Sequence, residues 1–165
     1  MRKIIFLDLD GVLNTLWWEK KEHVDKYGYA FDPNAVANLA KIIEETGAEI
    51  VISSSWKFMG LSEMQDMWEV RGLPGKIIDI TPNTVSDEML LSADLDHMEL
   101  MPIRGMEIKE WLEKKGKKVS QYAILDDMDA MLPEQKSHFV QTNPNVGITE
   151  DDAFKAISIL NHLEH

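Results

Sequence analysis

Two aspartates separated by one residue follow the first apolar run of the chain, in the segment MRKIIFLDLDGVLN. Residues i and i+2 of a strand share one face, so Asp8 and Asp10 can act on one ligand while Leu9 points into the core. Gly11 permits a sharp turn that brings the backbone close to a ligand. Paired carboxylates of this kind suit metal binding and acid–base chemistry.

Polar residues also end two later apolar runs: Ser53 to Ser55 follow one, and Asp126-Asp127 follow the other. The carboxyl ends of parallel strands border one crevice, so these residues are expected to converge with Asp8 and Asp10. Carboxylates gathered in one crevice repel one another unless a cation lies among them. Because the chain has no cysteine and no histidine pair at i, i+4, the oxygen ligands favour Mg²⁺.

A magnesium ion, a hydroxyl at Ser53 and a cation at Arg104 together describe a site for a phosphoryl group. A carboxylate nucleophile would add an aspartyl-phosphate step. Arg104 opens a predicted helix, where the helix dipole disfavours a cation, and this placement points to a functional role. Lys57, Lys76 and Lys109 remain alternatives for the basic position.

The elements that must position these residues alternate along the chain. Strands are predicted at 3–9, 49–53, 76–80, 122–125 and 138–141. Two helices are predicted before residue 75: one from Asp32-Pro33 to Gly47, and one that starts at a capping box of Ser62 and Gln65 and reaches Arg71-Gly72. Two more are predicted later, from Arg104 to Lys115 and from Thr149 onward. The apolar face of the last helix would carry Phe154, Ile157, Leu160 and Leu163. This alternation predicts an α/β fold: a doubly wound, Rossmann-like parallel sheet of about five strands with helices on both faces.

Length and charge limit the alternatives. The 165 residues suggest a single domain over 1–162, with short inserts at about 15–31 and 83–103, and with 163–165 as a vector-derived tail. The net charge of −12 gives no long-range attraction to nucleic acid or to a membrane. No apolar run approaches the ~20 residues of a membrane span and no signal peptide is apparent, so a cytoplasmic protein without a membrane partner is expected.

The motifs resemble those of the haloacid dehalogenase (HAD) superfamily. DLDGVLN is similar to the first motif of that superfamily, and the serine run, Arg104-Gly105 and Asp126-Asp127 match its second, third and fourth motifs in order, over a region from Ile4 to about Leu160. The segments SSSW, KIIDITP, RGMEIKEWL and YAILDDM are similar to those of small HAD-like domains in bacterial and phage RNA-repair proteins. The resemblance implies the same α/β fold with a minimal cap.

The resemblance also implies roles for single residues. Asp8 would be the nucleophile and a magnesium ligand, and Asp10 would be the general acid and base with its backbone carbonyl on the metal. Ser53, or Ser54 in its place, would hold a phosphoryl oxygen. Arg104 stands where the family usually has lysine, and Asp126 and Asp127 would be further magnesium ligands. Trp17 and Trp18 lie in the segment that forms the family's flap over the active site, where they would stack on a base or sugar or pack locally.

The function expected from these residues is that of a Mg²⁺-dependent phosphatase acting through phospho-Asp8. The inserts are too short to form cap domains, because chains below about 40 residues rarely fold alone, so the active site is expected to be open. An open site admits a phosphate on a large molecule such as a nucleic acid, although the net charge of −12 disfavours nucleic acid. The alternatives are a phosphatase for small metabolites or nucleotides and a non-catalytic phospho-acceptor or interaction domain.

Overall fold

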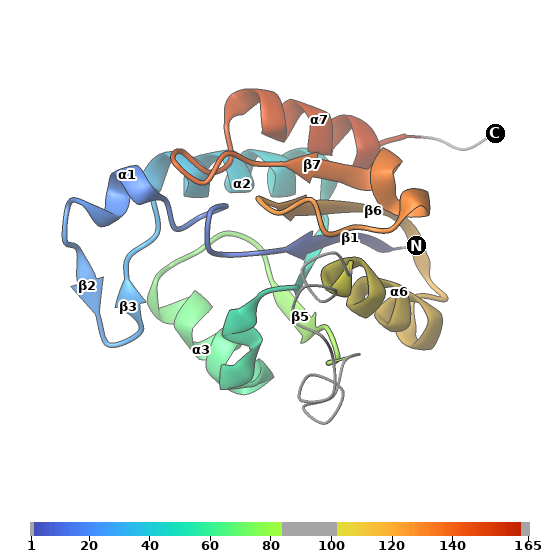
Figure 1. The fold of residues 1–165 in the computed structure, drawn as a ribbon, viewed down its shortest axis with the longest axis horizontal. Coiled ribbons are helices and arrows are strands. Elements are labelled where there is room, and N and C mark those ends of the chain that lie inside the picture. Colours follow the sequence, from blue (N-terminus) through green and yellow to red (C-terminus); the bar gives the residue numbers. More distant parts are fainter. Residues whose placement is uncertain (1, 84–101, 163–165) are drawn as a thin grey trace, which may run out of the picture.

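Five parallel strands form one sheet in the order β5-β4-β1-β6-β7 (Figure 1). The computed structural model describes residues 2–83 and 102–162. The strands are β1 Arg2–Leu7, β4 Glu49–Ile52, β5 Ile77–Ile80, β6 Val119–Asp126 and β7 Phe139–Gln141. The predicted parallel sheet is therefore confirmed.

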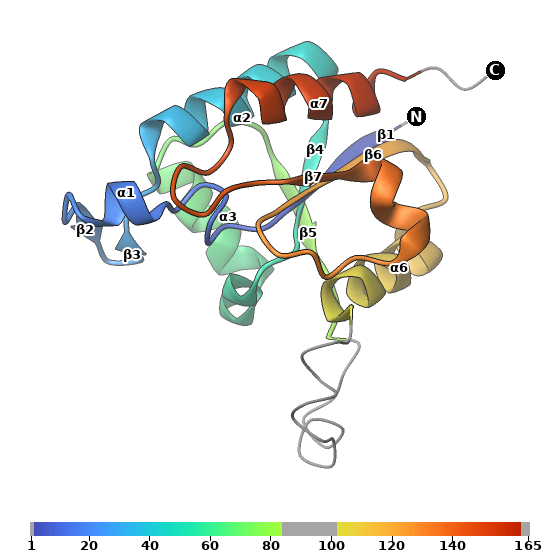
Figure 2. The same ribbon diagram turned by 45° about the horizontal axis from the view of Figure 1, so that its top comes forward.

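Helices cover both faces of this sheet, as predicted. The helices are α1 Leu16–Glu19, α2 Pro33–Thr46, α3 Leu61–Val70, α6 Ile103–Lys115 and α7 Glu150–Leu160, with 3-10 turns η1 Ser55–Met59 and η2 Pro133–His138. Helices α2 and α7 lie side by side on one face, and α6 covers the other (Figures 1 and 2). Helix α3 contacts η1 and the edge strand β5.

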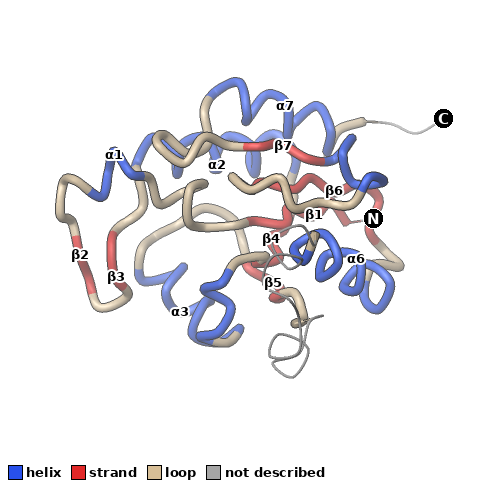
Figure 3. Tube along the Cα trace, viewed as in Figure 1, coloured by secondary structure: helices blue, strands red, loops and turns tan. Residues whose placement is uncertain are grey.

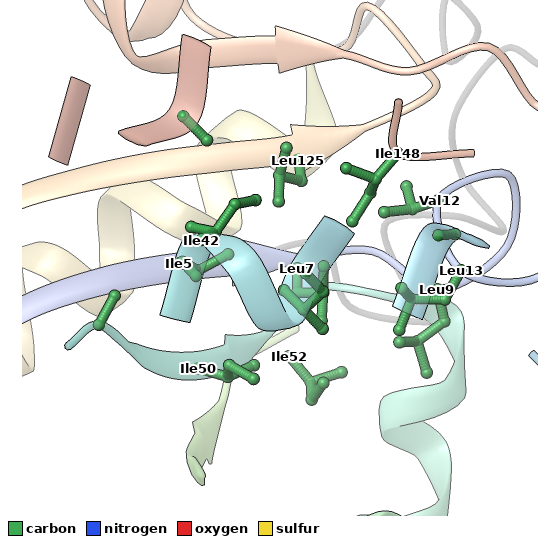
Figure 4. Close-up of a cluster of buried hydrophobic side chains, with 14 of the residues drawn as sticks. Ile5, Leu7, Leu9, Val12, Leu13, Ile42, Ile50, Ile52, Leu125 and Ile148 are labelled. Atoms are coloured by element: carbon green, nitrogen blue, oxygen red, sulfur yellow. The ribbon is translucent and has the colours of Figure 1, made fainter. Parts of the chain in front are cut away.

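The central strand β1 is apolar and buried from Ile4 to Leu7 because both of its faces are covered there. Ile5 and Leu7 join the larger buried cluster under α2 and α7, part of which is drawn in Figure 4. Ile4 and Phe6 point to the opposite face and pack in a second cluster with Trp111 of α6. A strand buried on both faces reads as a continuous hydrophobic run, which explains the sequence pattern.

The direction in which strands are added to the sheet reverses between β1 and β6. The chain proceeds from β1 to β4 and β5 on one side, and from β6 to β7 on the other. Beyond the ends of the strands, the Asp8 amide donates to the Leu125 carbonyl at 3.0 Å and the Ser53 amide donates to the Leu7 carbonyl at 2.9 Å. These hydrogen bonds align the carboxyl ends of β1, β4 and β6, which carry the candidate residues. They do so at the point where folds of this kind form a binding crevice.

The first insert folds as a small unit beside this crevice, which we call the flap (residues 15–31). It contains α1 and a hairpin of two antiparallel strands, β2 Val24–Asp25 and β3 Gly28–Tyr29 (Figure 3). Neither the short helix nor the hairpin was predicted. Of the second predicted insert, residues 84–101 lie outside the described residues, as does the predicted tail at 163–165.

Two predictions about helix ends differ in outcome. Helix α2 is capped by Asp32, whose Oδ1 accepts from the Asn34 amide at 2.9 Å, and it ends at Gly47 in the left-handed conformation, as the sequence indicated. The predicted capping box at α3 is wrong. The cap residue there is Gly60 without a side-chain hydrogen bond, and Gln65 instead donates to the Ile77 carbonyl at 2.9 Å.

The apolar face of α7 also differs from the prediction. Phe154 is 72% exposed, and the fully buried apolar positions of the helix are Ala153, Ala156 and Leu160. Small residues at 153 and 156 allow α7 to lie close to α2, so the contact does not require the large side chain of Phe154. Leu163 lies outside the described residues.

Candidate active site

Three strand ends bring together Asp8, Ser53 and Asp126, each at most 2% exposed. The guanidinium of Arg104 links them. Its Nη1 donates to the Ser53 carbonyl at 2.8 Å and lies 3.0 Å from both Asp8 Oδ1 and Asp126 Oδ2. Residues from β1, β4, β6 and α6 that are far apart in sequence therefore form one charged cluster at the carboxyl edge of the sheet.

Arg104 reaches Asp8 because α6 begins close to this edge. The neighbouring Gly105 donates to the Ala130 carbonyl at 2.9 Å, and a Cβ at Gly105 would lie 2.5 Å from Gln135 Oε1. Only glycine lets the start of the helix approach the 130–135 segment so closely, and this approach fixes the place of Arg104.

The other three basic candidates have different surroundings. Lys57 forms a 2.7 Å ion pair with the buried Glu107. Lys109 lies 3.9 Å from Glu134. Lys76 directly precedes β5 and so lies at the amino edge of the sheet. Among the residues that the structure describes, Arg104 is the cation that contacts Asp8.

Three carboxylates form a group that could hold a metal ion. Asp8, Asp126 and Asp127 each offer one oxygen, and these oxygens lie within 4.8 Å of one another. Gly11, with φ of +80°, makes room for the group, because a Cβ there would lie 2.4 Å from Asp127 Oδ2. An oxygen-only donor set of this kind fits a hard cation such as Mg²⁺.

Burial and mutual repulsion perturb these acids. Burial raises the pKa of Asp8 to about 6, although Arg104 beside it opposes the rise. Burial, with a further contribution from the neighbouring Asp8 charge, raises the pKa of Asp126 to about 8. A cation held among the carboxylates would favour their ionised forms and lower both pKa values.

Asp10 lies at the rim of this cluster and has different partners. Its exposed carboxylate accepts two hydrogen bonds on the same oxygen, Oδ1: from Trp56 Nε1 at 3.0 Å and from Asn14 Nδ2 at 3.1 Å. The loop that carries Asp10 is fixed to the rest of the fold, since Thr142 Oγ1 donates to the Gly11 carbonyl at 2.8 Å. Within the described part of the chain, the metal-binding group does not include the Asp10 side chain.

The two serines that the sequence left as alternatives have different environments. Ser54 caps η1, with its hydroxyl accepting from the Trp56 amide at 3.2 Å. Ser53 Oγ is buried and has no hydrogen-bond partner among the described residues. A buried hydroxyl without a partner is costly, so Ser53 is the serine whose hydroxyl is available for a ligand.

The two tryptophans singled out in the flap make local contacts. Trp18 stacks on His23 with ring centroids 4.8 Å apart, and Lys21 lies 4.8 Å from the ring centroid of the half-exposed Trp17. The aromatic residue that reaches a candidate catalytic side chain is Trp56, which the sequence reasoning missed. Its position directly after the serine run was the available signal.

Comparison with known proteins identifies the family. The model for the HAD domain in Swiss Army Knife RNA repair proteins matches residues 4–153. Neither a search of curated proteins nor a search of solved structures gave a match. In the described ranges 2–83 and 102–162, no helix is long and apolar enough to cross a membrane. The matched region takes in the described strands, except the first two residues of β1, and nearly all of the described chain, and the chain belongs to the HAD domains of the Swiss Army Knife RNA repair family.

Proposed function

We propose that the protein is a Mg²⁺-dependent phosphatase that forms an aspartyl-phosphate on Asp8. The observation that carries this proposal is the buried cluster itself. A carboxylate, an arginine and a serine hydroxyl that has no partner among the described residues converge at one sheet edge, with two further carboxylates beside them. Phosphoryl transfer depends mainly on positioning and on charge neutralisation, and these groups supply both.

Asp8 is arranged to act as the nucleophile. Its Oδ1 accepts from the Leu9 amide at 2.9 Å and lies 3.0 Å from Arg104 Nη1, which fixes the carboxylate and leaves Oδ2 for attack. The attack would form a bond between Oδ2 and phosphorus and break the bond from phosphorus to the leaving oxygen. Ser53 Oγ and the Arg104 guanidinium would bind oxygens of the phosphoryl group.

Asp10 would transfer the protons of both half-reactions. In the first, it would give a proton to the leaving oxygen. In the second, it would take a proton from a water molecule that attacks phosphorus, which releases inorganic phosphate and regenerates Asp8. Asp8, Asp126 and Asp127 would hold Mg²⁺, which when bound supplies charge neutralisation for the phosphoryl group.

The substrate that we propose is a phosphate at the end of a polynucleotide. The family description, RNA repair, supports this choice. The net charge of −12 opposes it, so binding would depend on the local cluster around Arg104 rather than on long-range attraction. A phosphatase for small metabolites or nucleotides remains the alternative.

Phosphate release from p-nitrophenyl phosphate tests the chemistry. We expect hydrolysis that requires Mg²⁺, is abolished by EDTA and falls on the order of 1,000-fold in Asp8→Asn. Asp129→Asn is the matched control, because Asp129 lies three residues beyond Asp126 and is exposed and paired with Lys136. Full activity in Asp8→Asn would contradict the proposal. Oligonucleotides with 3′- or 5′-phosphates, compared with free nucleotides, then test the substrate class.

A further inference from the structure

The role of Trp56 is not explained by the charged cluster of Asp8, Ser53, Asp126 and Arg104. Its backbone amide is held by Ser54 Oγ at 3.2 Å, at the cap of η1. Its ring packs against Phe31, with centroids 5.6 Å apart, and the Arg71 guanidinium lies 6.0 Å from its centroid. A side chain fixed at its backbone and along its ring can present its indole N–H in one direction.

That direction is toward Asp10. The indole Nε1 donates to Asp10 Oδ1 at 3.0 Å, and Asn14 Nδ2 donates to the same oxygen at 3.1 Å. Two donors on Oδ1 favour a lone-pair acceptor there, so a proton on this carboxyl group belongs on Oδ2. The two hydrogen bonds therefore determine which oxygen of Asp10 carries the transferable proton.

We propose that Trp56 is a positioning residue for proton transfer: its indole N–H holds Asp10 so that Oδ2 faces the leaving oxygen. This inference rests on the proposed phosphatase function. Trp56 does not contact the Asp8 cluster through any described hydrogen bond, so its effect passes through Asp10. Removing the donor leaves Oδ1 with one hydrogen bond and lets the carboxyl group rotate, which misplaces the proton.

The predicted consequence depends on the leaving group. An alkyl phosphate expels a strongly basic alkoxide that must be protonated, whereas p-nitrophenolate leaves with little help. The ratio kcat/KM includes only steps through the first irreversible one, so it reports leaving-group expulsion rather than the later hydrolysis of phospho-Asp8. A positioning defect at Asp10 should therefore lower kcat/KM for the alkyl ester selectively.

Trp56→Phe tests this directly, because phenylalanine keeps an aromatic ring beside Phe31 and removes the donor, at the cost of some ring volume that the control also loses. We expect kcat/KM for a phosphorylated alkyl alcohol to fall about tenfold or more, and that for p-nitrophenyl phosphate to fall less than about threefold. Trp68→Phe is the matched control. Trp68 belongs to the same aromatic group, 6.5 Å from Phe31, but its indole donates to the Pro74 carbonyl at 2.8 Å. This control should lower kcat/KM for both substrates by the same factor or leave both values unchanged.

A second measurement does not require turnover. In ¹⁵N-labelled protein, the indole signal that disappears in Trp56→Phe should shift and exchange faster with water in Asp10→Ala, while the Trp68 signal stays in place. An unshifted Trp56 signal in Asp10→Ala, or an equal fall in kcat/KM for both substrates in Trp56→Phe, would overturn the positioning role and leave the phosphatase proposal intact. If the unsubstituted protein hydrolyses neither ester although the indole signal responds, the phosphatase proposal fails and the positioning role fails with it.

Discussion

The buried acids of the site are destabilising when they ionise. The pKa of Asp126 rises from 3.8 to about 8, mainly through burial and then through repulsion by Asp8, with Arg104 acting in the opposite direction. Between these two values the folded protein holds a proton that the unfolded chain has released. The free energy of unfolding therefore falls as pH rises through this window, and ionised Asp126 opposes folding at the upper end.

The first prediction follows from this fall in the free energy of unfolding with rising pH. Without divalent cations, Asp126→Asn should be more stable than the unsubstituted protein at pH 8, by about 1–2 kcal/mol, because the amide carries no charge to bury. The gain should shrink toward pH 5, where Asp126 is already protonated in the folded state. Urea unfolding at several pH values measures it, and Mg²⁺ should reverse the order at pH 8, because it stabilises the protein with all three carboxylates more than the variant with two. A pH-independent difference would contradict the assignment.

Ser53 and Ser54 give a second prediction, in which stability and binding separate. Because Ser53 Oγ is buried and has no partner among the described residues, Ser53→Ala should leave the melting temperature unchanged or raise it. It should weaken inhibition by inorganic phosphate about tenfold, through loss of one hydrogen bond to a charged ligand.

Ser54→Ala is the comparison for that prediction. It removes the hydroxyl that caps η1 and should cost about 0.5–1 kcal/mol of stability. Thermal unfolding and phosphate inhibition, measured on both variants, decide between the two serines. Weaker phosphate binding in Ser54→Ala alone would assign the ligand contact to Ser54.

Among the elements, those with strong local signals could be predicted. Strand β1 followed from a continuous apolar run, and α2 followed from Asp32 with Pro33 at its start and Gly47 at its end. Because three strand ends carry the polar residues, the meeting of Asp8, Ser53 and Asp126 could also be foreseen. Their catalytic roles stay predictions.

Elements that depend on distant contacts could not be predicted. Strands β2 and β3 have two residues each, too few for a periodic pattern, and the hairpin is fixed by Arg71, which lies 46 residues from Asp25 along the chain. The contact between Trp56 and Asp10 spans the same separation. No local pattern reports either pairing, because both arise only when the sheet brings the segments together.

Arg71 holds the flap, and this gives the third prediction. Its Nε and Nη2 donate to the Asp25 carboxylate at 2.9 and 2.7 Å, and its guanidinium lies 4.6 Å from the ring centroid of Phe31. Arg71→Met keeps the apolar stem and removes both hydrogen bonds to Asp25, together with the 3.3 Å hydrogen bond to the Gly28 carbonyl. We expect trypsin to cut the flap about tenfold faster at Lys20, Lys21 and Lys26, because local opening becomes easier.

The control for the flap experiment is Lys136→Met. This substitution breaks an ion pair with Asp129 in which both side chains are at least half exposed, so it should not change cleavage of the flap. Mass spectrometry of the first fragments identifies the sites of cleavage. Equal cleavage rates in Arg71→Met and the unsubstituted protein would show that other contacts hold the hairpin.

At the scale of the whole molecule, charge decides how a polyanionic substrate approaches. The chain carries 29 acidic and 17 basic residues, so the net charge of −12 repels an oligonucleotide at long range. Close to the site, Lys57 is neutralised by Glu107, and Arg104 is shared between Asp8 and Asp126. The attraction that acts on the terminal phosphate is therefore short-ranged, whereas the repulsion is long-ranged and is screened by salt.

The last prediction is an inverted salt dependence. Proteins that bind nucleic acid through a basic surface lose affinity as salt rises, because binding releases counterions. Here we expect kcat/KM for a phosphorylated oligonucleotide to rise about two- to fivefold between about 20 and 200 mM NaCl at fixed Mg²⁺, since screening removes the repulsion. The value for p-nitrophenyl phosphate, measured in parallel, should change much less because that substrate carries a single phosphate group and no phosphodiester backbone. A steep fall with salt on the oligonucleotide alone would instead show that a basic surface guides the strand to Asp8.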